Sequence, residues 1–218
     1  MSDVTPAEFW EARYTDSGGL WSGNANPTFV AAVSDLPPGT ALDLGCGEGG
    51  DTIWLADRGW TATGIDISPT AVRRAAETAR SAGIPDDRVR FVAADLATWE
   101  SDDSYDLVAA SFLHSPVDFP RTEVLRRAAE LVAPGGHLLI LSHADFPPWA
   151  GAGDRNAEEH GEAHHEHRFL TPAEEIEALA LDPGRWDVLV AETRERDATG
   201  PDGTHAVLSD VVVLLHRN

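Results

Sequence analysis

Short apolar runs alternate with helical patterns along most of the chain. Runs of four to six mostly apolar residues predict strands at residues 41–44, 61–65, 89–93, 105–110 and 137–141. Helical patterns separate several of these runs, at residues 49–58, 69–82 and 120–132. Apolar runs with little alternation are typical of strands covered on both faces, and regular alternation of strands and helices requires right-handed crossovers. The pattern therefore predicts an α/β fold built on a doubly wound parallel sheet.

Three segments carry a strong helix-start pattern, in which a hydroxyl residue is followed by proline. The hydroxyl can accept a hydrogen bond from an amide of the first turn, and proline suits the first helical position because it has no amide hydrogen. In two of the segments a glutamate stands at the third helical position and completes a capping box. The segments begin with Thr5-Pro6, Ser68-Pro69 and Thr171-Pro172, and they predict helices at residues 6–16, 69–82 and 172–180.

The C-terminal part of the chain has a different pattern. Apolar runs at residues 186–190 and 206–215 flank the turn-rich residues 199–203, which predicts an antiparallel hairpin. No linker or internal repeat interrupts the chain, so residues 1–218 are expected to form one domain. Residues 145–168 contain prolines and glycines followed by acids and histidines. A segment of more than about 15 residues without a regular pattern predicts a lid, a binding loop or disorder.

The chain is strongly acidic, with 37 acidic and 16 basic residues and a formal net charge of −21. All the basic residues are arginine, so a Schiff-base lysine and the phosphate-binding lysines of Walker and kinase sites are excluded. The single cysteine, Cys46, excludes an intrachain disulfide and cysteine-rich zinc sites. The negative charge disfavours nucleic acids and anionic membranes as partners.

The sequence also bears on where the protein works. No apolar run approaches the roughly 20 residues that a membrane-spanning helix requires. The N-terminus, Met1-Ser2-Asp3-Val4, is acidic and lacks the apolar core of a secretion signal. We therefore expect a cytoplasmic protein that acts on a small molecule as a monomer or a homodimer.

The strongest functional pattern is a glycine-rich turn within residues 41–50, Ala-Leu-Asp-Leu-Gly-Cys-Gly-Glu-Gly-Gly, which links a predicted strand to a helix. In an open α/β sheet, cofactors bind in the crevice beyond the carboxyl ends of the strands, and glycines let the backbone turn sharply and approach a ligand. Asp66 ends the second predicted strand, 21 residues after Gly45, where a carboxylate can bind the hydroxyls of an adenosine ribose. Asp95 follows the third strand, close enough to meet an adenine amino group.

The spacing Gly45-x-Gly47-x-x-Gly50 also fits the dinucleotide fingerprint, so an NAD(P)-dependent oxidoreductase is an alternative. Acidic residues around the turn argue against it, because Asp43, Glu48 and Asp51 stand where a diphosphate needs positive potential. The same carboxylates suit a cationic sulfonium with an ammonium group, which favours S-adenosylmethionine (SAM). Glu48 and Asp51 alternatively serve only to cap the helix. A non-catalytic SAM-binding regulator is a second alternative, since a fold does not establish chemistry.

A set of motifs in a fixed order resembles the class I SAM-dependent methyltransferases. The resemblance spans roughly residues 5–216 and rests on the glycine turn, Gly64-Ile65-Asp66-Ile67-Ser68, Ala94-Asp95-Leu96, Tyr105-Asp106-Leu107-Val108 and Leu131-x-x-Pro134-Gly135-Gly136. It implies a Rossmann-like sheet of seven strands in the order 3-2-1-4-5-7-6 with strand 7 antiparallel, which agrees with the predicted hairpin. It also implies that Gly45 and Gly47 lie near the methionine moiety, Asp66 on the ribose and Asp95 on the adenine. The other cofactor-binding residues expected at these positions are Asp43, Cys46, Ile67, Leu96 and Ser111.

The two ends of the chain resemble particular methyltransferases. Phe9-Trp10-x-x-x-Tyr14, Gly18-Gly19 and Trp21 are similar to the aromatic N-terminal segment of thiopurine methyltransferases, and residues from Arg168 onward are similar to tellurite-resistance methyltransferases. The resemblance implies that residues 5–30 cap the cofactor and that Trp10, Tyr14 and Trp21 contact it. Alternatively, these aromatic side chains only pack the helix on the sheet edge.

Two histidines follow predicted strands and are the candidate catalytic residues. His114 comes after the fourth strand and His143 after the fifth, so both can face the acceptor, where a neutral imidazole can take a proton. Alternatively, each histidine only bonds a nearby carbonyl. The sequence 110–115, Ala-Ser-Phe-Leu-His-Ser, lacks the Asn/Asp-Pro-Pro-aromatic pattern of amino-methyltransferases that act on adenine or glutamine. We expect in-line methyl transfer to a small molecule, and one class of acceptor that fits is a soft sulfur, selenium or tellurium nucleophile.

A second group of histidines lies in the unpatterned segment: His160, His164, His165 and His167. The first two have helical i, i+4 spacing, and neighbouring glutamates could complete a metal site. Gly161 and the dense charge around it favour a solvated loop or a lid over the acceptor, so no metal is predicted.

Overall fold

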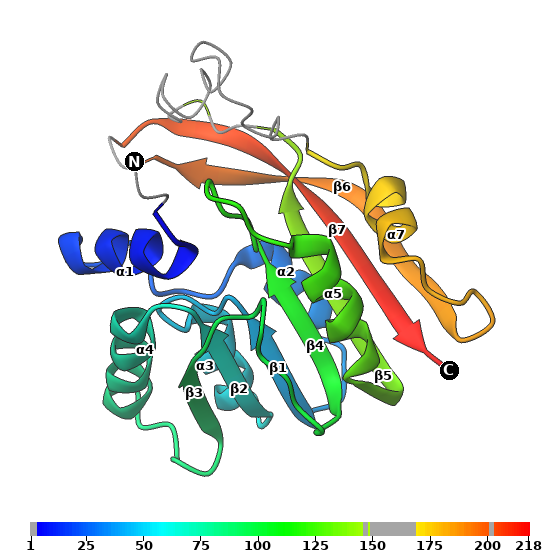
Figure 1. Cartoon of the computed structure of the whole chain (residues 1–218), viewed down its shortest axis with the longest axis horizontal. Coiled ribbons are helices and arrows are strands. Elements are labelled where there is room, and N and C mark those ends of the chain that lie inside the picture. The colour runs from blue at the N-terminus through cyan, green and yellow to red at the C-terminus, as the bar shows by residue number, and fades with distance from the viewer. Residues whose placement is uncertain (1–3, 146–147, 149–168, 201–202) are drawn as a thin grey trace.

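The computed structural model describes residues 4–145, 148, 169–200 and 203–218, which form a seven-stranded sheet between two layers of helices (Figure 1). The sheet order is β3-β2-β1-β4-β5-β7-β6, as the sequence predicts. The strands are β1 (Thr40–Leu44), β2 (Thr61–Asp66), β3 (Val89–Ala93), β4 (Tyr105–Ser111), β5 (Val132–His143), β6 (Trp186–Thr199) and β7 (His205–Arg217). The helices are α1 (Pro6–Asp16), α2 (Pro27–Val33), α3 (Gly50–Asp57), α4 (Pro69–Ser81), α5 (Arg121–Glu130) and α7 (Pro172–Leu179).

The pairing of the strands confirms a doubly wound sheet that ends in an antiparallel hairpin. The pairs β1–β2, β2–β3, β1–β4 and β4–β5 are parallel, whereas β7 runs antiparallel to both β5 and β6. The strand order reverses beside β1, because β2 and β4 lie on opposite sides of it. This reversal places a crevice at the carboxyl ends of β1 and β4, where ligands bind in open α/β sheets.

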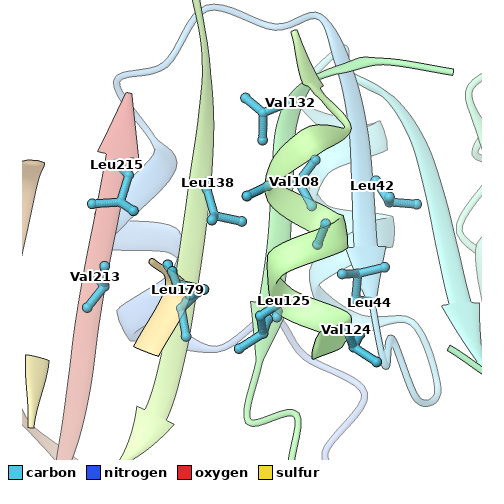
Figure 2. Packing of buried hydrophobic residues seen from close by; sticks show 14 of the residues in the cluster. Leu42, Leu44, Val108, Val124, Leu125, Val132, Leu138, Leu179, Val213 and Leu215 are labelled. Carbon is cyan, nitrogen blue, oxygen red and sulfur yellow. The ribbon is translucent and has the colours of Figure 1, made fainter. Parts of the chain in front are cut away.

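Apolar side chains on the two faces of the sheet form separate core layers. One face packs against α5 and α7 through residues such as Leu125 and Leu179, which lie over Val108 and Leu138 (Figure 2). The other face packs against α2 and α3 through Phe29 and Leu55, among others. Because both faces are covered, the central strands need unbroken apolar runs, which is the pattern that predicted them.

The expected helix starts are confirmed. The Thr5 hydroxyl accepts a hydrogen bond from the Glu8 amide (3.3 Å) while the Glu8 carboxylate accepts one from the Thr5 amide (3.0 Å), and Thr171 and Glu174 repeat this exchange at α7. The Ser68 hydroxyl caps α4 through the Ala71 amide. Local side chains therefore decide where these helices begin.

Two features differ from the sequence prediction. Helix α2 was missed, because seven residues are too few for a periodic pattern, although Asn26 before Pro27 is a cap that marks its start. Strand β6 continues to Thr199, well past the expected end at residue 190, and pairs with β7 as far as His205. This extension follows a polar run that includes Glu192 and Arg194, which an edge strand tolerates because its outer side faces solvent.

The unpatterned segment at residues 145–168 lies outside the described residues except for Asp145 and Pro148. The predicted lid and the cluster of His160, His164, His165 and His167 fall in this part, so both stay predictions. None of the helices in the described ranges is long and apolar enough to cross a membrane.

Candidate active site

The glycine-rich turn between β1 and α3 is held tightly against the end of β2. The amides of Gly45 and Cys46 both donate to the Ile65 carbonyl, at 2.8 and 2.9 Å. Gly45 and Gly47 have φ angles of +73° and +54°, a conformation that side chains with a Cβ rarely adopt. A Cβ on Gly45 would lie 2.7 Å from Leu113 Cδ1, so the loop after β4 closes over this glycine. The turn therefore provides bare backbone at the carboxyl end of β1.

Asp66 joins this turn to the end of β2. Its Oδ2 accepts the Gly47 amide and its Oδ1 accepts the Ser68 amide, each at 2.9 Å, and the side chain is buried. Burial raises the pKa of Asp66, although the amide hydrogen bonds oppose the rise. Each carboxylate oxygen accepts one amide and has a further lone pair for a ligand hydroxyl. Asp66 therefore stands where the sequence expects the ribose to bind.

Two further carboxyl groups lie below the turn, the buried Asp43 and the half-buried Asp51. Asp43 accepts a hydrogen bond from the Thr52 hydroxyl (2.6 Å), and Asp51 accepts the Asn26 amide (2.8 Å). Burial and the charge of Asp51 raise the pKa of Asp43 to about 7, and burial raises the pKa of Asp51 to about 6. In the part of the chain that the structure describes, neither carboxylate pairs with an arginine or a histidine. The turn thus contains buried negative potential that a cationic ligand would neutralise.

The N-terminal aromatic residues cover the turn. The buried Tyr14 hydroxyl accepts the Trp21 indole N–H (3.0 Å), and a Cβ on Gly47 would lie 3.0 Å from that hydroxyl and 3.2 Å from the Trp21 ring. The Trp10 indole N–H donates to the Ser115 hydroxyl after β4 (3.3 Å). Trp10, Tyr14 and Trp21 thus lie against the loops after β1 and β4.

Two acids fix this cap to the domain. Glu11 on α1 accepts hydrogen bonds from the hydroxyls of Ser68 and Thr70 at the start of α4. Glu48, which the sequence places among the acids around the turn, accepts the amides of Leu20 and Trp21 and pairs with Arg74 at 3.0 Å. Glu48 therefore anchors the cap, and the unpaired acids at the turn are Asp43 and Asp51.

The other expected cofactor residues lie around the same edge of the sheet. Asp95 is exposed after β3, with its Oδ1 on the Ala97 amide (2.8 Å), while the next residue, Leu96, is buried in the core. Ile67 is half-buried between Asp66 and the start of α4. Cys46 packs toward Gly64 of β2, where burial raises the pKa of its thiol, so it fills space beside the turn. The Ser111 hydroxyl is buried beside the Asp51 carboxyl group.

The two candidate catalytic histidines come together beyond β4 and β5. Their ring centroids lie 6.3 Å apart with planes inclined by 19°, and the Phe112 ring lies 4.5 Å from His143. Phe112 has a φ of +52°, and its carbonyl accepts the His114 amide (2.8 Å). Backbone strain of this kind persists where the surroundings enforce it, commonly at functional sites. Burial lowers the pKa of His143, which leaves a neutral imidazole at neutral pH.

A buried ion pair that the sequence did not predict holds the loop after β4. Arg121 at the start of α5 donates to both carboxylate oxygens of Glu175 on α7, at 2.8 and 2.9 Å. Its Nε donates to the Leu113 carbonyl (3.0 Å), and the Ser142 hydroxyl bonds both partners. Arg121 and Glu175 are far apart in the sequence, and no local pattern pairs them. The network connects the segment after β4 with β5 and both helices on that face.

Comparison with known proteins agrees with this geometry. Residues 41–136 match the family model of a methyltransferase domain. Thiocyanate methyltransferase 1 of Brassica oleracea is 33% identical over 64% of this chain and 66% of its own length. Probable thiol methyltransferase 2 of Arabidopsis thaliana is 31% identical over 61% of this chain and 60% of its own length. The chain thus spans less than two thirds of the length of these curated relatives.

Solved structures resemble nearly the whole chain. A structure described as the conversion of a disulfide bond into a thioacetal group during echinomycin biosynthesis superposes with a TM-score of 0.71 and 25% identity, covering 97% of this chain and 93% of the other. TehB from Haemophilus influenzae has a TM-score of 0.65 at 16% identity, over 97% of this chain and 67% of its own, and supports the fold alone. Together with the sheet order and the glycine turn, these findings show the fold of the class I SAM-dependent methyltransferases, and in sequence the chain is similar to thiocyanate and thiol methyltransferases.

Proposed function

We propose that this protein transfers a methyl group from SAM to a soft nucleophile, a sulfur, selenium or tellurium atom, on a small molecule. One observation carries the proposal: the buried Asp43 and the half-buried Asp51, which have no cationic partner among the described residues, lie below a glycine turn that an aromatic segment covers. A sulfonium and an ammonium group would supply the missing positive charge. When bound, SAM supplies a methyl group activated by its sulfonium. The protein's part is to position the reactants and exclude water.

The residues of the site fit such a ligand. Asp66 has lone pairs free for the two ribose hydroxyls, and the exposed Asp95 has an Oδ2 available for the adenine amino group. The backbone of Gly45 and Gly47 permits close approach of the methionine part. Residues 5–30 would act as a cap, since Tyr14 and Trp21 already lie against Gly47.

The acceptor side supports a soft nucleophile. The two curated relatives described above are named for thiocyanate and thiol methylation, and the echinomycin structure is described as the conversion of a disulfide bond into a thioacetal group. A sulfur anion needs no strong base, whereas a protonated acceptor would use His114 or His143. We further propose that residues 1–218 act as one domain in the cytoplasm, as a monomer or homodimer, without nucleic acid. Cell fractionation and size-exclusion chromatography test these points.

One assay, with a parallel titration, tests the two alternatives, a non-catalytic SAM-binding regulator and an NAD(P)-dependent oxidoreductase. Incubation of the protein with SAM and a panel of thiols, phenols and amines should yield S-adenosylhomocysteine (SAH) and a methylated acceptor. A non-catalytic regulator would bind SAM without producing SAH. An oxidoreductase would bind NAD(P) in a parallel titration, which the buried acids beside the turn disfavour. Absence of turnover with every acceptor, despite binding of SAM, would overturn the proposed enzymatic function.

Replacement of Asp66 by alanine should weaken SAM binding by about 10- to 100-fold. The change removes charge-assisted hydrogen bonds to the ribose, which are worth about 1.5–3 kcal/mol. Calorimetric titration of both proteins measures the difference. Asp106→Ala is the matched control. This carboxylate also accepts a backbone amide, that of Thr40, but it lies at the amino ends of β1 and β4, away from the glycine turn. Equal affinity of the two variants would contradict the assignment of Asp66.

The affinity for SAM should rise between pH about 6 and about 8. The pKa of Asp43 is raised to about 7 and that of Asp51 to about 6, so both carboxyls ionise in this window and then attract the cation. SAH lacks the sulfonium charge, so its affinity should rise less, and Asp43→Asn should flatten the difference. Calorimetry at several pH values measures the ratio of the two affinities.

The same groups predict how the free protein responds to pH. Because the pKa of each carboxyl is higher in the folded than in the unfolded chain, the folded state binds more protons. The resulting stabilisation is present below pH about 4 and is lost as the pH rises to about 7. Added SAM should offset this loss. A pH-independent ratio of SAM to SAH affinity would rule out these carboxyls as the group that recognises the cation.

A further inference from the structure

Asp210 of β7 is fully buried at the acceptor side of the site, and only one of its two oxygens has hydrogen-bond donors. Its Oδ2 accepts Arg196 Nε (2.6 Å) and the Thr28 hydroxyl (3.0 Å). Its Oδ1 has no hydrogen-bond partner in the described part of the chain. Leaving a buried acceptor of a charged group unsatisfied costs folding free energy, so such an atom calls for an explanation.

His143 lies beside this oxygen. Asp210 and His143 are directly opposite each other in the antiparallel pair β5–β7, and Oδ1 lies 3.9 Å from His143 Nδ1. This distance is longer than a hydrogen bond, and side-chain rotation can shorten it. Hydrogen bonds of catalytic groups are often long without substrate and tighten when it binds.

The surroundings of His143 restrict its ring. Phe112 lies at 4.5 Å from the ring and also contacts the Arg196 guanidinium, whose central carbon is 5.7 Å from the phenyl centroid. The titratable and charged groups that face His143 are Asp210 on β7, Arg196 on β6 and His114 after β4. The side chain of His143 is 32% exposed, so its ring reaches from this cluster to the surface where an acceptor would bind.

We propose that Asp210 is a positioning residue that fixes the tautomer of His143, in which Nδ1–H donates a hydrogen bond to the Asp210 carboxylate and the Nε2 lone pair faces the acceptor. His143 is then the base for acceptors that carry a proton, such as thiols. This inference rests on the proposed function and adds to it the class of acceptor that the site can activate.

In the transfer step, the acceptor S–H gives its proton to His143 Nε2, and the sulfur lone pair forms the bond to the methyl carbon. The bond between that carbon and the sulfonium breaks, its electron pair stays on the cofactor sulfur, and SAH leaves as a neutral thioether. The imidazolium is stabilised by Asp210 and later releases its proton to water. Burial, aided to a smaller extent by Arg196, lowers the pKa of His143 against the opposing charge of Asp210 and so favours a neutral ring before each turnover.

Asp210→Asn tests the proposal with little change of shape. The amide oxygen can still accept from Arg196 and Thr28, while the NH2 group replaces Oδ1 opposite His143. It would then donate to Nδ1 and force the proton onto Nε2, the wrong tautomer for a base. A series of thiols from an alkyl thiol, protonated at neutral pH, to 4-nitrothiophenol, largely ionised there, separates acceptors that need a base from those that do not.

The expected result is selective. With the alkyl thiol, kcat of Asp210→Asn should fall by about 100-fold or more, within the range that general bases contribute. With 4-nitrothiophenol it should fall by less than about threefold, because no proton is removed. The wild-type kcat for the alkyl thiol should also decrease toward acid pH as His143 becomes protonated, whereas the rate of the variant should follow only the ionised fraction of the thiol.

Thr28→Val is the matched control. It removes the other side-chain donor to Oδ2 and leaves Oδ1 opposite His143, so stability falls but the ratio of the two acceptor rates should stay that of the wild type. The inference would be overturned if Asp210→Asn lowered kcat equally with both acceptors, or if the wild type methylated only the ionised thiol. Either outcome would leave the proposed function standing. Failure of the wild type with every thiol and phenol would instead contradict the proposed function.

Discussion

Replacement of Gly45 by valine is expected to abolish measurable SAM binding while the protein stays folded. The residue has a φ of +73°, and a side chain there would meet Leu113 Cδ1 at 2.7 Å and fill the space beside the turn. The left-handed conformation costs roughly 1–2 kcal/mol for a residue with a Cβ, so some stability is lost as well. Calorimetry measures binding, and urea unfolding measures the free energy of unfolding.

The variant Gly83→Val separates the effect of backbone strain from the effect of a side chain that blocks the approach of the cofactor. Gly83 has a nearly identical φ of +75°, but a Cβ there would meet no atom within 4 Å. The two variants should lose similar stability, and only Gly45→Val should lose the cofactor. If Gly45→Val binds SAM as tightly as Gly83→Val does, the glycine turn is not where the methionine part lies.

Arg121→Met should lower the free energy of unfolding by about 3–5 kcal/mol, the effect of leaving a buried charge without its partner. Glu175 is only 1% exposed, and Arg121 supplies its two charged hydrogen bonds. Chemical denaturation of both proteins measures the difference.

Two further variants make this prediction specific. The double variant Arg121→Met, Glu175→Leu should recover most of the stability, because replacing both members of a buried pair by apolar residues is often neutral. Arg73→Met breaks an exposed pair with Glu77 and should change stability by less than about 1 kcal/mol. If Arg121→Met lowers the free energy of unfolding no more than Arg73→Met does, the ion pair between Arg121 and Glu175 contributes nothing to the stability of the fold.

The paired replacement also tests the loop after β4. Arg121 Nε donates to the Leu113 carbonyl, and Leu113 lies over Gly45. The double variant loses this hydrogen bond even where its stability is restored. We therefore expect it to keep a normal unfolding free energy and to show a lower kcat, since the loop carries His114.

The sequence by itself determined the local starts and the general plan of the fold. The side chains of Thr5 and Thr171 cap their helices by accepting hydrogen bonds from backbone amides only three residues further along the chain. The sequence alone therefore locates these helix starts. The apolar central strands were equally predictable, since burial on both faces leaves an unbroken pattern. The glycine turn and Asp66 were predictable too, because turn geometry and strand ends fix their places.

The pattern of apolar residues could not predict the polar elements. The part of β6 that contains Glu192 and Arg194 looks like a loop, because an edge strand needs no apolar alternation. Helix α2 is too short to show a period, and only the Asn26-Pro27 start marks it. In both cases tertiary packing, rather than intrinsic preference, selects the conformation.

Only the tertiary structure decided the polar contacts of the acceptor side. Thr28 and Asp210 are 182 residues apart, and Arg121 and Glu175 are 54 apart, yet each pair meets at hydrogen-bond distance. Asp210 in the sequence is one acid in a strand of valines and leucines, with nothing to show that β5 brings His143 beside it. A periodic pattern tells which face of an element is buried. The partner of a buried charge depends on which elements the sheet order brings together, and on the need of every buried charge for a partner.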